Sequence, residues 1–301
     1  MAYLFVHFTG ESENAEQVYF AVSRDGLHFT DLNGTQPVMV SDIGEKGVRD
    51  PFIIRTEENE FVIIGTDLRI ASGKGWGPAQ FEGSRSLVVF KSKDLVNWSK
   101  AKLVEVGIPT AGCVWAPEAV YSKERDEYLV FWASMVREPG EEGAKQRIYA
   151  SWTKDFENYS EPFKYIEHDN HVIDTDIIYA DGRYYRFSKD ETTKVIKMDH
   201  AAKLEGPYTD LPCPTLDNLY GVEGPEAYYI SEMGKWCLIV DRFATNGGYL
   251  PVICEDLEKG DLRILEDSEF DMGLRKKRHG GVITITDEEY DRLVKAYGIE
   301  K

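Results

Sequence analysis

One stretch of sequence decides the fold: Val48-Arg-Asp-Pro-Phe-Ile-Ile54, a Pro-containing step into a short apolar strand. The same step returns at Ala116-Pro117-Glu118-Ala119-Val120 and Gly224-Pro225-Glu226-Ala227-Tyr228, and Asp174-Thr175-Asp176-Ile177-Ile178 repeats it with Thr in place of Pro. Successive copies are about 50 to 66 residues apart, which is close to the size of a four-stranded β-propeller blade with its insertions. The repeat therefore predicts four blades.

A second repeat marks the outer part of each unit. A strand runs into Ser or Thr, an Asp follows two residues later, and an aromatic residue stands four residues after the Asp. The copies are Ser23 to Phe29, Ser92 to Trp98 and Thr153 to Tyr159, with a degenerate copy at residues 255–257. Elsewhere, segments rich in Val, Ile, Tyr, Phe and Trp alternate with a period of two, which is typical of β-strands. The chain is therefore expected to be all-β.

The two ends of the chain complement each other. Residues 279–285 supply an inner strand without outer partners, whereas residues 3–8 and 18–32 supply outer strands without an inner one. Pairing the terminal strands makes a fifth blade and removes the open edge that a linear array would leave. The expected fold is a five-bladed β-propeller in which residues 1–301 form a single domain. A capping box also predicts a short C-terminal helix over residues 287–297.

The balance of charges limits the expected partners. Lys and Arg total 35 against 53 Asp and Glu, which gives a formal net charge of −18. Such a surface repels phosphate backbones and anionic lipid, so neither nucleic acid nor a membrane is expected, whereas an uncharged sugar is compatible with it. The N-terminus lacks the pattern of a signal peptide, and no stretch reaches the roughly 18 apolar residues that span a bilayer. The four scattered cysteines are expected to be reduced, mostly buried thiols, and a cytoplasmic location is expected.

Residues beside the repeated step should converge, because the inner strands of a propeller surround its axis. This rule gathers one set of polar and aromatic side chains: Asp50, Trp115, Asp174, Asp176, Glu223, Arg278 and His279. Three blades thus each place a carboxylate at one centre, and buried carboxylates are costly unless they are used or paired. Hydrolysis of a glycosidic bond needs one carboxylic acid and a second carboxylate, and a third carboxylate nearby raises the pKa of the acid.

The ordered segments Val48-Arg-Asp-Pro-Phe, Val114-Trp-Ala-Pro-Glu, Ile173-Asp-Thr-Asp, Val222-Glu-Gly-Pro and Arg278-His-Gly resemble the signatures of glycoside hydrolase family 43. The resemblance covers almost the whole chain. It implies a five-bladed propeller that acts with inversion on arabinofuranosides, xylosides and related glycans. By motif, it makes Asp50 the general base, Asp174 the residue that tunes the acid's pKa, and Glu223 the general acid.

The resemblance also implies roles for residues around the three acids. Trp115 resembles the aromatic residue beside the sugar, and Arg278 resembles the basic residue that holds the tuning carboxylate. His279 corresponds to a histidine near an axial ion, often calcium, that it would contact through water. That ion is structural, because the chemistry itself requires no cofactor. Thr175 stands where the family signature has Pro, and this departure makes Asp176 a rival of Asp174.

A Gly-rich segment, residues 67–86, surrounds Trp76 and is too long for a hairpin turn. It is interpreted either as a rim loop that places Trp76 over the sugar or as a plain surface loop. The predicted function is an exo-acting, inverting glycoside hydrolase that releases α-L-arabinofuranose, β-D-xylose or both from hemicellulose-derived oligosaccharides. The alternative is a propeller that binds glycans or proteins without catalysis.

Overall fold

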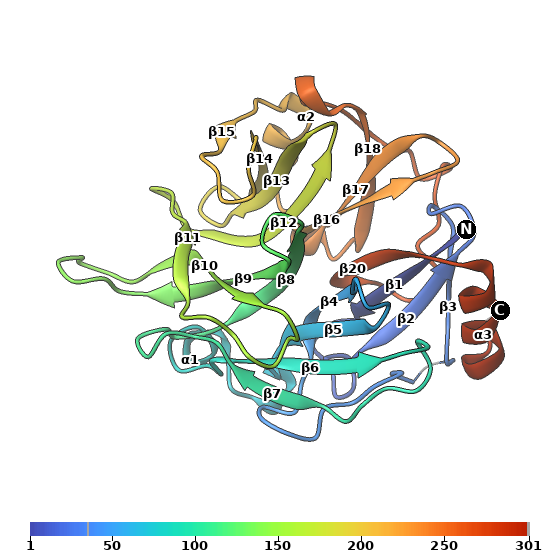
Figure 1. Ribbon diagram of the computed structural model, residues 1–301, viewed down its shortest axis with the longest axis horizontal. Helices are drawn as coiled ribbons and strands as arrows, with labels where there is room; N and C mark the ends of the chain where they lie inside the picture. Colours follow the sequence, from blue (N-terminus) through green and yellow to red (C-terminus); the bar gives the residue numbers. More distant parts are fainter. Residues whose placement is uncertain (35, 300–301) are drawn as a thin grey trace.

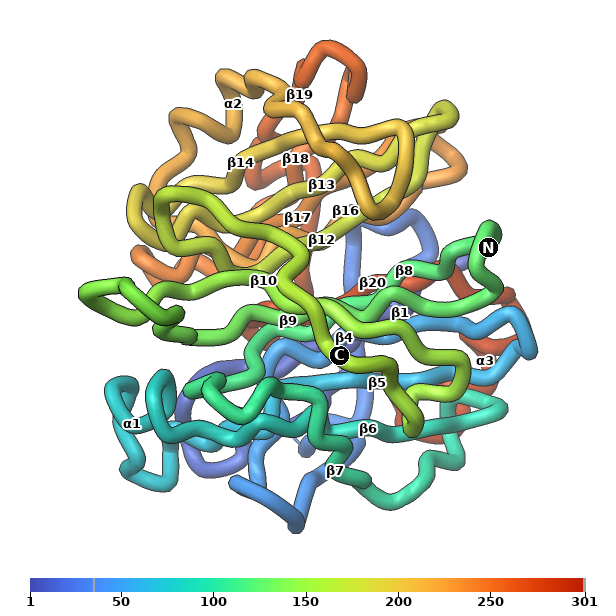
Figure 2. Tube along the Cα trace, turned by 60° about the vertical axis from the view of Figure 1, so that its left-hand side comes forward, coloured from blue at the N-terminus to red at the C-terminus, as the bar shows by residue number. Residues whose placement is uncertain are grey.

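The computed structural model describes residues 1–34 and 36–299 of the chain. Residues 35, 300 and 301, which the expected domain includes, lie outside the described residues. Twenty strands form five four-stranded antiparallel sheets arranged as the blades of a propeller, with the inner strands β4, β8, β12, β16 and β20 around the centre (Figure 1). Figure 2, turned by 60°, shows the same strands near the middle of the molecule, with β7 and β19 farther out. The expected five-bladed all-β propeller is confirmed.

The blades are numbered here by the order of their inner strands. Blade 1 contains β4 (Arg49–Arg55), β5 (Phe61–Thr66), β6 (Ser86–Ser92) and β7 (Lys102–Glu105). Blade 2 contains β8 (Trp115–Ser122), β9 (Glu127–Val136), β10 (Lys145–Thr153) and β11 (Phe163–Ile166). Blade 3 contains β12 (Val172–Ala180), β13 (Arg183–Asp190), β14 (Val195–Ala201) and β15 (Thr209–Asp210), and blade 4 contains β16 (Glu223–Ile230), β17 (Lys235–Asp241), β18 (Tyr249–Asp256) and β19 (Asp261–Ile264).

Blade 5 closes the ring with strands from both ends of the chain. Its order is β20 (Arg278–Ile285), β1 (Ala2–Phe8), β2 (Tyr19–Ser23) and β3 (Phe29–Asp31). The terminal strands run antiparallel, with Phe5 opposite Val282. Both marked ends of the chain lie on the same side of the molecule, beside this blade (Figure 1). The predicted closure by terminal strands is therefore confirmed.

The hydrophobic core is divided among the blades. Five clusters of buried side chains each lie between two neighbouring blades, so that every blade packs on both faces. Strand β5, for example, is buried along its whole length because blade 5 covers one face and blade 2 the other. Burial on two faces explains why such strands are nearly continuous hydrophobic runs. All four cysteines are free and buried, as expected.

The second repeat caps the turn between the third and fourth strands of a blade. In blade 1, Asp94 Oδ1 accepts hydrogen bonds from the backbone N–H groups of Val96 and Asn97, and Ser92 Oγ accepts one from Leu95. Asp25 and Asp155 make equivalent bonds in blades 5 and 2. These bonds to the ionised form outweigh burial and lower the pKa of Asp94 to about 2. The repeat is thus a structural motif of the blades.

Helices are few and short. The expected C-terminal helix is α3 (Asp287–Tyr297), with the predicted capping box at Thr286 and Glu289. The structure adds α1 (Trp76–Phe81) and α2 (Pro214–Asp217), and the 3-10 turns η1 (Ile70–Ser72), η2 (Phe243–Thr245) and η3 (Leu257–Lys259). Among the described residues, no helix has the length and apolar character needed to cross a membrane.

Candidate active site

A cavity of about 440 Å³ opens on the propeller axis. Its lining contains every residue of the predicted site except Asp176, together with several that the sequence did not suggest. They are Glu11, Arg49, Asp50, Leu68, Trp76, Gln80, Trp115, Ile173, Asp174, Lys189, Glu191, Glu223, Phe243, Arg278 and His279. The volume falls within the range of small-molecule sites. Asp50, Asp174 and Glu223 are called the cavity carboxylates below.

Each inner strand carries a bulge where it reaches the cavity. The ladder register shifts next to Asp50, Ala116, Asp174 and Gly224, and these four residues have φ values of 48°, 47°, 45° and 52°. A left-handed backbone is rare for residues other than glycine and is characteristic of functional sites. Because a bulge re-aims the chain, two consecutive residues of one strand can face the cavity. This explains why both Arg49 and Asp50 line it.

Gly224 shows why one of these positions has no side chain. A Cβ atom at this residue would lie 2.6 Å from Cγ of His279, so any larger residue would collide with the imidazole. The Gly224 N–H donates a hydrogen bond to Asp174 Oδ2 at 3.0 Å, and its carbonyl accepts one from Tyr249. Glycine at this position therefore lets blades 3, 4 and 5 approach one another at the site.

Asp50 is held between two blades. Thr66 Oγ1 donates to Asp50 Oδ2 at 2.9 Å and accepts a hydrogen bond from the Ala116 N–H at 2.8 Å. Asp50 Oδ1 lies 3.7 Å from His279 Nδ1. The Asp50 side chain is 16% exposed, so its carboxylate is fixed in position yet open to water in the cavity.

Asp174 faces the same imidazole as Asp50. Its Oδ2 lies 3.9 Å from His279 Nδ1, and only 9% of its side chain is exposed. Burial raises the pKa of Asp174 to about 6, while the charges of His279 and Lys189 oppose that rise. Asp174 therefore lines the cavity with Glu223, whereas its rival Asp176 lies two residues farther along β12 and does not line it.

Glu223 is held by two cations. Its Oε2 accepts a hydrogen bond from Lys189 Nζ at 2.8 Å, and its Oε1 accepts one from Arg278 Nη2 at 2.9 Å. Burial raises the pKa of Glu223, but the charges of Lys189 and Arg278 outweigh burial and hold that pKa below its usual value.

The structure corrects the expected partner of Arg278. The family signature suggested that this guanidinium holds the tuning carboxylate Asp174, but its ion pairs within the described chain go to Glu223 and Asp241. The reason is the register of blade 4, in which Glu223 on β16 pairs with Asp241 on β17. Arg278 thus lies opposite two acids of one blade and neutralises both.

Two indole rings form one wall of the cavity. Trp76 lies edge-on to Trp115, with ring centroids 6.0 Å apart and an interplanar angle of 79°. The Arg49 guanidinium lies 5.0 Å from the centre of the Trp76 ring, and Arg49 is itself paired with the buried Glu16 at 2.9 Å. Trp76 is 44% exposed, so helix α1 places an aromatic face at the rim of the cavity. Of the two interpretations of residues 67–86, the structure favours a rim element.

Sequence reasoning missed Lys189 and Asp241. Both lie on second strands, β13 and β17, whereas the repeated step marks only the inner strands. Lys189 pairs with Ile173, the residue before Asp174, and Asp241 pairs with Glu223. Pairing each inner strand with the strand that follows it would have brought both residues to the site.

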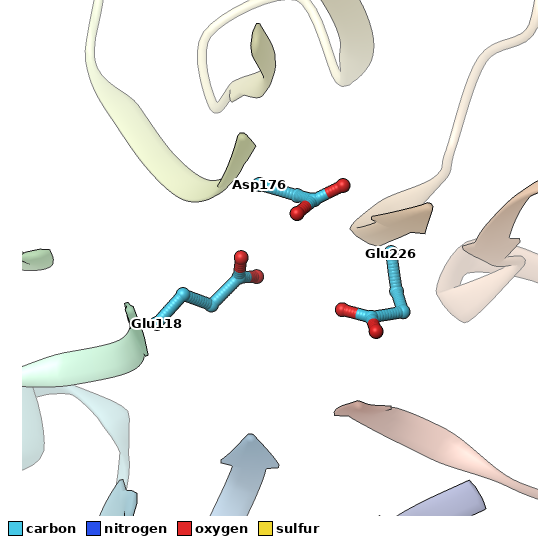
Figure 3. A group of neighbouring side chains, drawn as sticks. All are labelled: Glu118, Asp176 and Glu226. Carbon is cyan, nitrogen blue, oxygen red and sulfur yellow. The ribbon is translucent and has the colours of Figure 1, made fainter. Parts of the chain in front are cut away.

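A second group of acids lies beyond the cavity on the same axis. Glu118, Asp176 and Glu226, called the axial carboxylates below, stand two residues after Ala116, Asp174 and Gly224 respectively, and they are 2%, 4% and 3% exposed. Figure 3 shows their carboxyl groups pointing toward one another. Sequence reasoning considered only Asp176 here, although the shared position after Pro117, Thr175 and Pro225 was a usable signal.

The axial ion that the family resemblance implies can be tested against these residues. A single imidazole such as His279 is a poor ligand set for calcium, which prefers six to eight oxygen ligands. The axial carboxylates supply such oxygens, and His279 Nε2 lies 3.8 Å from Glu118 Oε1. The residues present therefore fit a hard cation, which would supply positive charge beneath the cavity.

A larger hollow, of about 540 Å³, lies away from the axis beside blade 3. Its lining includes His168, His171, Asp190, Asp199 and Asp210. Asp199 is already paired with Arg186, and Asp190 accepts hydrogen bonds from Asn170 and two backbone amides. It brings together no aromatic wall and no set of acids from different blades, so the axial cavity is the candidate site.

Comparisons with known proteins agree with this geometry. The family model described as a probable glycosyl hydrolase domain, related to glycoside hydrolase family 43, matches residues 1–291. An α-L-arabinofuranosidase of Bifidobacterium longum is 30% identical over 238 residues, which is 69% of this chain. The chain spans only 22% of the length of that relative.

Solved structures show the same fold at low sequence identity. A family 43 protein from Bacillus licheniformis matches 94% of this chain and 56% of its own, with a TM-score of 0.56 at 16% identity. An exo-β-1,3-galactanase from Phanerochaete chrysosporium matches 76% of this chain and 53% of its own, with a TM-score of 0.53 at 14% identity. With the family model spanning nearly all residues, the chain belongs to the family of glycosyl hydrolase domains related to glycoside hydrolase family 43.

Proposed function

We propose that this chain is an exo-acting, inverting glycoside hydrolase that releases a terminal pentose, α-L-arabinofuranose or β-D-xylose, from hemicellulose-derived oligosaccharides. The observation that carries the proposal is the meeting of three carboxylates from three blades, Asp50, Asp174 and Glu223, in one cavity of about 440 Å³. An inverting glycosidase needs an acid on one side of the scissile bond and a base on the other. The arabinofuranosidase relative supports the pentose.

Asp50 is proposed as the general base. Its carboxylate is fixed by Thr66 and still partly exposed, so it can accept a proton from a water molecule held in the cavity. That water attacks the anomeric carbon from the side opposite the leaving group, which inverts the configuration. No covalent sugar–enzyme bond forms in this scheme.

Glu223 is proposed as the general acid, and its two cations set a condition on this role. The acid must carry a proton when the glycosidic oxygen leaves, but Lys189 and Arg278 favour its ionised form. Catalytic hydrogen bonds commonly rearrange when substrate binds. The role therefore requires that a bound sugar loosen one of the two ion pairs. Asp174, whose own pKa is raised to about 6, is the neighbouring carboxylate proposed to tune the pKa of Glu223.

Trp115 and Trp76 are proposed to hold the sugar. Pyranose and furanose rings present C–H faces that pack on indole rings, and the two rings together line one wall of the cavity. Arg49 stands over Trp76 and is anchored by Glu16, which keeps that wall in place.

Release of 4-nitrophenol from 4-nitrophenyl α-L-arabinofuranoside and from 4-nitrophenyl β-D-xyloside tests the proposal. Turnover of at least one substrate by the wild type, lost in Asp50→Ala, is the expected result. The alternative is a non-catalytic propeller that binds glycans or proteins. It predicts no turnover of either substrate, together with measurable binding of oligosaccharide by calorimetry.

A further inference from the structure

A second pocket, of about 360 Å³, adjoins the axial cavity and is built from α1 and from blades 2 and 3. It shares half of its eight lining residues with the cavity: Gln80, Trp115, Ile173 and Glu191. The other four do not line the cavity: Met135, Gln146, His171 and Thr192. This space is called the side pocket below. Because the two spaces share walls, a molecule held in the cavity can continue into the side pocket.

Gln146 gives the side pocket an unused hydrogen-bond acceptor. The residue lies near the start of β10 and is 2% exposed. Its Nε2 lies 3.7 Å from Cys113 Sγ, whereas its Oε1 has no hydrogen-bond partner within the described chain. A buried polar atom without a partner is costly, so this oxygen calls for a donor from outside the chain. Since Gln146 lines the side pocket, a hydroxyl group of a molecule bound there can be that donor.

The polar wall around Gln146 is held in place by the backbone. The Gln146 N–H donates to His171 Nδ1 at 3.3 Å, so the neutral imidazole carries its proton on Nε2 and can donate a hydrogen bond. The His171 N–H donates to Thr192 Oγ1 at 3.2 Å, and the Glu191 N–H donates to the His171 carbonyl at 2.9 Å. These bonds join β10 to the segment before β12 and to the turn after β13. The wall is therefore formed before any ligand arrives.

The composition of the side pocket favours a neutral sugar as its ligand. Trp115, Met135 and Ile173 offer apolar surface on which the C–H faces of a sugar can pack. The lining, all eight residues of which the structure describes, contains no Lys or Arg to hold a carboxylate or phosphate group. Its one acid, Glu191, is already paired with Lys189 and Lys194. Apolar walls with a few fixed hydrogen-bonding groups are typical of small-molecule sites.

Lys189 connects the side pocket to the proposed general acid. Its Nζ lies 2.8 Å from Glu223 Oε2 and 2.6 Å from Glu191 Oε2, and Glu191 lines both spaces. In the proposed mechanism Glu223 protonates the oxygen that leaves with the rest of the substrate. The side pocket therefore begins beside the ion pairs of the group that acts on the leaving oxygen.

We propose that the side pocket is the leaving-group subsite, which takes the neutral sugar next to the released pentose, and that Gln146 Oε1 accepts a hydrogen bond from a hydroxyl of that sugar. Gln146 is then a specificity-determining residue that favours an oligosaccharide over a simple pentoside. The assignment to the leaving group rests on the proposed function. The affinity of the side pocket for a neutral sugar does not.

The kinetic test compares two kinds of leaving group. Wild type and Gln146→Met are assayed on 4-nitrophenyl pentosides and on oligosaccharides that carry the same terminal pentose, namely xylotriose and arabinofuranosyl-xylobiose. The nitrophenyl group has no hydroxyl for Gln146, whereas the sugar does. In Gln146→Met the ratio of kcat/KM on the oligosaccharide to kcat/KM on the nitrophenyl substrate should fall about fivefold to tenfold, the worth of one neutral hydrogen bond. The Tm should not fall, because Met has a similar volume and leaves no buried oxygen unpaired.

Two further variants separate binding from folding. Gln17→Met is the matched control, because Gln17 is 4% exposed and both ends of its amide are paired, with the Lys46 carbonyl and the Ser41 N–H. This variant should lower the Tm and leave the ratio of the two kcat/KM values as in the wild type. Thr192→Trp fills the side pocket from an exposed position and should lower that ratio as Gln146→Met does, even if Gln146→Met does not fold.

A binding experiment separates failure of the side pocket from failure of the proposed function. Xylobiose and cellobiose are titrated by calorimetry into Asp50→Ala, which should not cleave them, and into Asp50→Ala combined with Gln146→Met. At least one of the two disaccharides should bind, and the second substitution should weaken its binding about fivefold to tenfold. Digalacturonate, which carries carboxylates, should bind at least about tenfold more weakly than the neutral disaccharide, because the lining has no cation for it.

The outcomes divide cleanly. If no substrate is turned over but a neutral disaccharide binds and Gln146→Met weakens it, the proposed function fails and the sugar site stands. A ratio of kcat/KM values unchanged in both Gln146→Met and Thr192→Trp would overturn the leaving-group subsite. Absence of disaccharide binding, or equal binding with and without Gln146, would overturn the sugar site itself. A lower Tm in Gln146→Met with an unchanged ratio would assign Gln146 a structural role only.

Discussion

Two inner strands, β12 and β16, each carry one cavity carboxylate and one axial carboxylate, yet the charges of the two groups are balanced differently. Glu223 has Lys189 and Arg278 as partners, and Asp50 is partly open to water. Glu118, Asp176 and Glu226 are closed off, with no Lys or Arg at ion-pair distance within the described chain. On β12 and β16, a shift of two or three residues along the strand thus separates an acid that lines the cavity from an acid that is closed off at the axis.

The repeated segment contributes residues to two separate groups of acids in the propeller. On β12, Ile173 and the bulge residue Asp174 line the cavity, while Asp176, two positions later, belongs to the axial carboxylates. His279 lies between the cavity carboxylates and the axial carboxylates, because its Nδ1 faces Asp50 and Asp174 and its Nε2 faces Glu118. If the two groups have separate roles, substitutions of the cavity carboxylates should change turnover and substitutions of the axial carboxylates should change stability.

The largest expected effect is at Asp50, the proposed general base. Asp50→Ala should reduce kcat by about 10³-fold or more, because removing a general base costs about 10²–10⁴-fold and no leaving group can replace the attacking water. Its melting temperature should stay close to that of the wild type. Steady-state kinetics on 4-nitrophenyl glycosides and a thermal melt measure both. A variant that keeps a tenth of its activity would remove Asp50 from the mechanism.

Asp174 and Asp176 lie on one strand, so they allow the sharpest test of whether the two groups of acids have separate roles. Asp174→Asn should reduce kcat by about 10²-fold. Asp176→Asn should change kcat less than tenfold while lowering the melting temperature, because Asp176 is one of the axial carboxylates and does not line the cavity. The same kinetic assay and thermal melt on both variants make the comparison. Equal or reversed losses of turnover would contradict separate roles for the two groups.

The role of Glu223 as the proposed general acid can be tested by changing the leaving group of the substrate. In Glu223→Gln, hydrolysis of an unactivated oligosaccharide should fall by about 10²-fold, whereas hydrolysis of 4-nitrophenyl glycosides should fall only about tenfold, because a nitrophenolate departs with little protonation. Relative kcat/KM values on the two substrate classes measure the effect. Equal losses on both would assign the proton donor to another group.

A smaller effect is expected from the cation beside Glu223. Lys189 lowers the pKa of that carboxyl, so Lys189→Met should raise it and move the alkaline limb of the kcat/KM profile to higher pH by about one unit. Lys197→Met is a matched control on the same blade, since Lys197 pairs with Asp217 outside the cavity. An unchanged limb, or a shift to lower pH, would show that Glu223 is not the group that must stay protonated.

Much of the fold followed from the sequence because the repeated step recurs at a blade-sized interval. Closure could be predicted since residues 279–285 lacked outer partners and residues 3–8 lacked an inner one. Helix α1 could not, because its six residues are too few to show a helical periodicity and include Gly77, a poor helix former.

The residues of the candidate site that adjoin the repeated step could be predicted from the sequence, and those on the second strands could not. Asp50, Asp174 and Glu223 adjoin the repeated step, so their convergence followed from the register of the blades. Lys189 and Asp241 reach the site only through pairing with the inner strands, which depends on hairpin register and not on any motif.

Proton NMR of the first-formed sugar tests the central claim most directly. Hydrolysis of an α-linked arabinofuranoside or a β-linked xyloside by the wild type is followed before the product mutarotates. Action through water activated by Asp50 predicts that the first anomeric signal is opposite in configuration to the substrate. A first product with the substrate's own configuration would contradict the mechanism, even if all three cavity carboxylates proved essential.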